Sequence, residues 1–163
     1  MVGGNEDLPA QTMTHIICTS ALITLIFAVP IFYFYVVDNI SVENMERELK
    51  EVADYVSNSL GNLYLLANST KCEILLEKTL DLPSTIRDST YYLEIVYDVD
   101  DNSAQYVKAY PTDSSWISVG SLILPGPKAD SGTGVVIESS EQTVVAGCLR
   151  NETGTYVWIK EGE

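Results

Sequence analysis

A run without charged side chains, residues 16–37, constrains this chain more than any other feature. As a helix these 22 residues would measure about 33 Å at ~1.5 Å per residue. That length matches the hydrocarbon core of a bilayer, which is about 30 Å thick. The apolar part of a secretion signal is shorter, about 7–15 residues, and follows a basic segment. Residues 1–14 contain no Lys or Arg, so we expect a retained membrane-spanning helix and not a cleaved signal.

A buried core helix is the third interpretation of this run. A helix that is apolar on all sides needs a large protein around it, and this chain has only 163 residues. Pro30 lies inside the run, and a neighbouring helix or a local rearrangement can satisfy the carbonyl that it frees. The residues expected to contact lipid or other helices are Ile16, Ile17, Leu22, Leu25, Ile26, Pro30, Phe34 and Val37.

An amphipathic helix is expected to follow over residues 38–70, without a break, so that one rod runs from about residue 12 to 68. Its apolar positions recur at gaps of three and four, with Ser59 as one miss. They are Val42, Met45, Leu49, Val52, Val56, Leu63 and Leu66. The stripe fits two interpretations: the helix lies on its own β-sheet, or it contacts the helices of other subunits. The second makes Val42, Met45, Leu49, Val52 and Val56 helix-packing residues.

From Lys71 onward the apolar period becomes two, which indicates strands. Polar turns separate about seven short candidates, within residues 72–82, 91–99, 105–110, 116–124, 135–138, 143–149 and 155–160, and residues 125–134 read as a loop. One long helix followed by strands predicts an α+β fold with a small antiparallel sheet. The expected organisation is a short acidic leader or cytoplasmic segment (1–14), a transmembrane helix (15–37), an amphipathic helix (38–70) and an extracellular β-domain (71–163).

The part after residue 37 is acidic, with nine basic and 21 acidic side chains, a net charge of −12. Such a surface repels nucleic acid and anionic lipid heads, so neither is an expected partner. Three Asn-x-Ser/Thr sequons, at Asn39, Asn68 and Asn151, suit N-glycosylation of an exported domain. Arg47 and Lys50, near the C-terminal flank of the apolar run, argue instead for a C-terminal domain inside the cell, since basic residues favour the cytoplasmic side. We expect a single-pass protein of the cell membrane with its C-terminal domain outside.

Two of the three cysteines, Cys72 and Cys148, lie in the expected outer domain. A disulfide between them is one interpretation, because oxidising compartments favour such bonds. Two buried free thiols are the other. Cys18 lies in the apolar run, where we expect a small packing residue.

A search for catalytic chemistry finds no constellation, and we expect a protein that is not an enzyme and that binds no cofactor or metal. His15 is the only histidine, and there is no nucleophile elbow, phosphate loop or zinc spacing. Asp98, Asp100 and Asn102 match part of a calcium loop. Ser103 stands at the required glycine and Ala109 at the bidentate glutamate, so a polar hairpin tip is the expected structure.

Two segments resemble type IV pilins, the archaeal branch most closely. "QTMTHIICTSALITLIF" is similar to the start of mature archaeal pilin-like proteins, and "LDLPSTIRDSTYYLEIVYD" is similar to the leucine–proline, turn and tyrosine-rich strand that follow their long helix. The resemblance implies leader cleavage between Ala10 and Gln11, with Gly3-Gly4 as an alternative, although Pro9 stands where the family has a charged residue. It also implies that the helix anchors the subunit in the bilayer and later packs with copies of itself or other pilin-like subunits in a filament core.

A pilin-like surface protein, either a structural subunit or a minor component of an archaeal type IV pilus-like filament, is therefore the leading functional hypothesis. The alternative is a single-span membrane protein whose outer β-domain binds a ligand or a partner, as a sensor or envelope accessory module.

Overall fold

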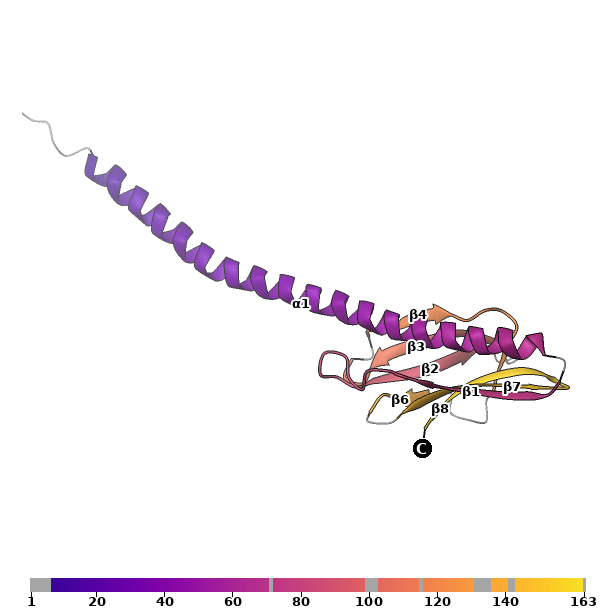
Figure 1. Ribbon diagram of the computed structural model, residues 1–163. Helices are drawn as coiled ribbons and strands as arrows, with labels where there is room; N and C mark the ends of the chain where they lie inside the picture. The colour runs from indigo at the N-terminus through magenta and orange to yellow at the C-terminus, as the bar shows by residue number, and fades with distance from the viewer. Residues whose placement is uncertain are drawn as a thin grey trace, which may run out of the picture. The chain divides into compact units, whose positions relative to one another are not determined.

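The computed structural model describes residues 7–70, 72–98, 103–114, 116–130, 136–140 and 143–162, with side chains from residue 13 onward. A helix of 63 residues, α1 (Asp7–Ser69), precedes the strands (Figure 1). This confirms the α+β class and the uninterrupted helix. The chain forms two compact units that meet inside α1, between Val42 and Glu43.

The strands of the C-terminal unit lie close to their expected positions. They are β1 (Ile74–Leu80), β2 (Tyr91–Tyr97), β3 (Ala104–Pro111), β4 (Val119–Leu122), β5 (Lys128–Ala129), β6 (Val136–Glu138), β7 (Val144–Asn151) and β8 (Gly154–Glu161). The two-residue strand β5 lies in the stretch expected to be a loop. β4 covers only the middle of its expected range, 116–124.

The described strands form two four-stranded sheets and not one. The order is β1-β7-β8-β5 in the first sheet and β4-β3-β2-β6 in the second. Neighbours pair antiparallel except β5 with β8, which pair parallel. Chain order alone could not place β6 beside β2 or β5 beside β8, because these pairings join segments far apart in sequence.

Strand β2 alternates as its sequence predicts, with Tyr91, Leu93 and Ile95 buried. Tyr97, expected on the same face, is only half-buried. The register with β3 shifts between Val96 and Tyr97, and such a bulge changes the direction in which the following side chains point.

Residues 43–69 of α1 pack on this β-structure through hydrogen bonds to β4 as well as apolar contacts. Lys50 Nζ donates to the carbonyl oxygen of Gly120 (2.6 Å), and Ser57 Oγ donates to that of Leu122 (2.5 Å). Hydrogen bonds from Ser121 and Lys50 hold the pKa of the Asp54 carboxyl below its usual value. Because β4 is an edge strand, these bonds occupy carbonyl groups that would otherwise be open to pairing with another strand.

The core of the C-terminal unit is shared by the helix and both sheets. Its most completely buried side chains include Leu49, Val56 and Leu60 of α1, Tyr91, Leu93 and Ile95 of β2, Val107 of β3, Cys148 of β7, and Val157 and Ile159 of β8. The Tyr91 hydroxyl donates to the carbonyl oxygen of Pro83 (2.7 Å), and burial raises the pKa of that phenol. The hydrogen bond removes the penalty of a buried hydroxyl, so the tyrosine serves as a core residue.

Candidate membrane and helix-packing segment

The apolar part of α1 exposes its side chains around the whole circumference. Leu25 is 59% exposed and Phe34 is 65% exposed, and the most apolar stretch, of mean hydropathy 2.3, has no buried residue. The helix is long and apolar enough to cross a membrane. The exposed large side chains include Ile16, Ile17, Leu22, Leu25, Ile26, Phe34 and Val37, which the sequence identified as contact residues.

The two threonine hydroxyls of this segment are satisfied within the helix. Thr19 Oγ1 donates to the carbonyl oxygen of His15 (2.5 Å), and Thr24 Oγ1 donates to that of Ser20 (2.9 Å). Such back-bonding to the preceding turn lowers the penalty of placing a hydroxyl in an apolar medium. Pro30 lies within α1 and does not end it.

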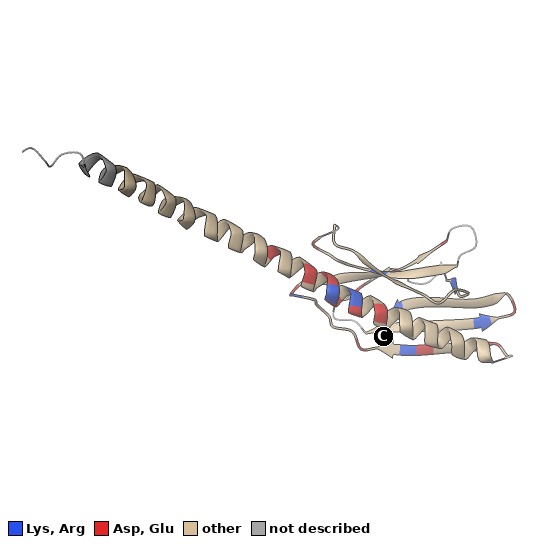
Figure 2. Ribbon diagram, turned by 90° about the horizontal axis from the view of Figure 1, so that it is seen from above, with Lys and Arg blue, Asp and Glu red and all other residues tan. Residues whose placement is uncertain are grey.

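The C-terminal end of the segment combines aromatic rings with the first charged residues. Aromatic residues gather near the C-terminal end, where the rings of Tyr33 and Phe34 meet edge to face with centroids 6.2 Å apart. Asp38 follows as the first charged residue, and the remaining charges of the described helix after it lie between there and Asp54 (Figure 2). Tyrosines beside the first charges are typical of the boundary between the hydrocarbon core and water.

The stripe over residues 42–56 divides between the two interpretations left open by the sequence. Leu49, Val52 and Val56 are buried against their own domain, so they do not contact other subunits. Val42 and Met45 are half-buried.

Beyond residue 56, part of the expected stripe is wrong. Leu66 is 55% exposed, whereas Ala53, Leu60 and Ala67 are buried with Leu63. The predicted stripe has a miss at Ser59. Leu60, four residues after Val56, is the buried apolar residue that continues the stripe there. Counting alanine as apolar would have revealed the continuous stripe at residues 49, 53, 56, 60, 63 and 67.

The disulfide between Cys72 and Cys148 is a wrong expectation, because both thiols are free. Strand register gives the reason. Cys148 lies opposite Leu76 in the β1–β7 pair, and Cys72 precedes Leu76 by four residues. β1 begins only at Ile74, which lies opposite Arg150, so Cys72 precedes the paired region whereas Cys148 lies inside it. Cys148 is buried, which raises the pKa of its thiol to about 11, and Cys72 is exposed.

The three sequons lie where their side chains reach the surface. Asn39 and Asn68 are exposed on α1, and Asn151 is half-buried at the end of β7. Asn151 Oδ1 accepts from the backbone N–H groups of Thr153 and Gly154, both at 3.0 Å, and so closes the expected β7–β8 turn. Asn68 Oδ1 accepts from Arg150 Nη1 (3.0 Å). Glycosylation at these positions stays a prediction.

Two other expectations concern the leader and the acidic turn. Ala10 and Gln11 lie within α1, outside the part whose side chains are described, and Gly3-Gly4 lies outside the described residues. The partial calcium pattern also falls largely outside them, at residues 99–102. In the described ranges no three His, Cys, Asp or Glu side chains gather as a metal site.

Comparison of the chain with protein-family models, with curated proteins and with solved structures finds no match.

Proposed function

We propose that this chain is a membrane-anchored, pilin-like protein of the cell surface, a structural subunit or minor component of an archaeal type IV pilus-like filament. The observation that carries the proposal is the charge-free stretch of α1 over residues 16–37, whose side chains stay exposed. Water disfavours such a surface by about 25 cal/mol for each Å² of apolar area, so another apolar body must cover it.

Two bodies can cover this surface in succession. A lipid bilayer covers all sides of a single helix, and its thickness fits the length of the segment. In a filament, the same segment packs against the helices of other copies, which replace lipid with protein of similar polarity. The resemblance in sequence supports this second step, and the satisfied hydroxyls of Thr19 and Thr24 suit both surroundings.

The C-terminal unit faces the outside in this proposal. Three sequons at accessible asparagines and the acidic composition of the domain support that orientation. The charge also keeps the displayed domains soluble and limits their adhesion to anionic surfaces.

The second candidate is a single-span protein whose outer domain binds a ligand or partner. It is favoured by the burial of Leu49, Val52 and Val56 within one subunit, which removes most of the helix stripe from contacts between copies. Anchoring by residues 16–37 is common to both candidates.

Electron microscopy of cell-surface filaments, combined with mass spectrometry of the filament protein, separates the two. We expect the chain in filaments, with its N-terminus beginning near Gln11 or after Gly3-Gly4. Finding it only as a dispersed membrane protein that retains Met1 would reject the filament function and leave the second candidate. Recovery in the aqueous fraction after membranes are pelleted, in cells without filaments, would reject both.

A further inference from the structure

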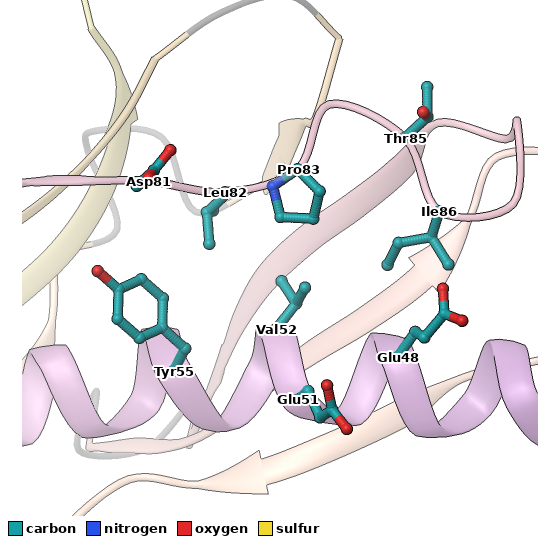
Figure 3. Close-up of a pocket in the computed structure, with 9 residues that line it drawn as sticks. All are labelled: Glu48, Glu51, Val52, Tyr55, Asp81, Leu82, Pro83, Thr85 and Ile86. Carbon is teal, nitrogen blue, oxygen red and sulfur yellow. The ribbon is translucent and has the colours of Figure 1, made fainter.

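A hollow of about 300 Å³ lies in the C-terminal unit between α1 and the segment that follows β1. Figure 3 shows Val52 and Tyr55 rising from the helix towards Asp81, Leu82 and Pro83. Thr85, Ile86, Glu48 and Glu51 complete the lining. Its volume lies at the lower end of the range for binding pockets and accommodates one long side chain.

The floor of the hollow is apolar and well fixed. Val52 and Ile86 are buried in the core, and Leu82 is half-buried beside Pro83. A tight turn holds Ile86 in place, since its N–H and carbonyl groups both pair with Ser89 (2.9 and 3.0 Å). Arg87 and Asp88 between them adopt positive φ angles of 49° and 65°, which close the turn. The floor is therefore formed by the fold and does not depend on a ligand.

The rim is acidic, with one carboxylate partly neutralised and two without a basic partner. Glu48 Oε1 lies 3.7 Å from Arg87 Nε. Glu51 and Asp81 are exposed, and in the described part of the chain neither forms an ion pair. A guest with an apolar stem and a positive head would match both the floor and the rim.

A lysine of the chain itself lies beside Tyr55, which lines the hollow. Lys78 Nζ lies 5.1 Å from the centroid of the Tyr55 ring and donates to Ser59 Oγ at 3.1 Å. The ring face attracts positive charge, and the methylenes of a lysine can lie on apolar surface while the ammonium stays polar. A positive charge beside Tyr55 is therefore compatible with the lining of the hollow.

We propose that this hollow binds a lysine or arginine side chain of a basic partner protein. The methylenes lie against Val52, Pro83 and Ile86, and the charged head lies at the acidic rim, to which Glu51 contributes from the helix and Asp81 from the opposite side. The outer domain of a second copy is disfavoured as the guest of this hollow, because the part of the chain after residue 37 has a net charge of −12 and two such surfaces repel. This interaction concerns the outer domain and holds whether or not the anchor assembles into filaments.

Two small probes test the chemistry: n-butylguanidinium and its neutral isostere n-butylurea. The full chain is held in nanodiscs of phosphatidylglycerol, which has no cationic head group to compete. Amide resonances of Val52, Tyr55 and Ile86 are followed by NMR during titration. We expect n-butylguanidinium to shift these three resonances, and n-butylurea to bind roughly two- to five-fold more weakly, as the loss of an exposed charge contact implies.

Variants then test whether the acidic side chains of the rim bind the charged head of the probe. The double change Glu51→Gln with Asp81→Asn should weaken n-butylguanidinium binding to about the level of n-butylurea. Glu152→Gln, an exposed acid of the β7–β8 turn, is the matched control and should leave binding unchanged. Unaltered resonances of Leu93 and Val157 in the core confirm that each variant is folded.

Equal binding of both probes, no shift at any of the three amides, or an unaffected double variant would each overturn the proposal. Shifts of the same amides with protein concentration, without a probe, would assign the hollow to a second copy and overturn it as well.

Discussion

Gly147 of β7 lies opposite Trp158 of β8, and the indole ring occupies the space where a side chain at position 147 would begin. Trp158 is buried, and its ring fits beside Gly147 because no side chain projects from the glycine. A small residue on one strand thus admits the largest side chain on the next.

Gly147→Ala should therefore destabilise the domain, because the new methyl group must displace the Trp158 ring. We expect a loss of about 1–3 kcal/mol in the free energy of unfolding, as for other overpacked cores. Gly120→Ala is the comparison, since its Cβ would meet the Tyr106 ring at 3.2 Å, a contact that a small shift relieves. Denaturant unfolding of the full chain in detergent measures both. A larger loss for Gly120→Ala would contradict the packing argument.

Ser57→Ala should weaken the attachment of α1 to the edge strand β4. The serine is buried, and without its hydroxyl the carbonyl of Leu122 loses its hydrogen bond (2.5 Å). We expect a loss of about 1–2 kcal/mol, whereas Asn58→Ala on the exposed side of the helix should change stability by less than about 0.5 kcal/mol. Similar effects in the two variants, measured by thermal unfolding, would show that the bond to β4 contributes little.

The two outer cysteines should differ in reactivity and remain unbonded. Iodoacetamide should modify exposed Cys72 in the native protein and leave Cys148 unmodified, because Cys148 is buried and burial raises the pKa of its thiol. After unfolding without reductant, both should react. Mass spectrometry that finds the two linked in protein from cells would contradict the strand register described above.

Stability should fall above pH 9 because of Cys148. The folded state raises the pKa of the thiol from 9.0 to about 11, so it retains a proton that the unfolded chain has lost. The stabilisation is fully present below pH 9 and declines as the pH rises towards 11, by at most about 1.4 kcal/mol per pH unit. Tyr91 acts in the same direction at higher pH, so the measurement compares the parent with Cys148→Ala. Parallel stability curves for the two proteins between pH 8 and 11 would refute the assignment to Cys148.

Leu25→Arg should abolish membrane anchoring and filament yield. A charge at the centre of a bilayer costs about 2.5–3.5 kcal/mol on the mild insertion scale, and a dry helix core offers it no partner. Arg47→Ala is the control, because Arg47 is exposed on α1 and a surface charge contributes about 0–1 kcal/mol. Membrane fractionation and filament counts measure both effects. If Leu25→Arg behaves like the parent protein, residues 16–37 are neither an anchor nor a packing core.

The sequence by itself determined the features that depend on local patterns. Residues 16–37 predicted a helix long and apolar enough to cross a bilayer, because they contain no charge over that length. The continuity of α1 beyond the apolar run followed from the absence of Gly and Pro between residues 38 and 60. Most strands were placed by their period of two, since alternation reflects a sheet with one buried face.

Tertiary structure decided everything that required knowing which distant segments meet. The β1–β7 register separates Cys72 from Cys148, and no count of cysteines could reveal it. Burial of Leu49, Val52 and Val56 against their own domain settled between two interpretations that give the same periodicity. The hollow joins Glu51 on the helix to Asp81 after β1, two acids that look unrelated along the chain. Periodicity records which face of an element is covered, whereas the partner that covers it depends on contacts between segments that the chain brings together only when it folds.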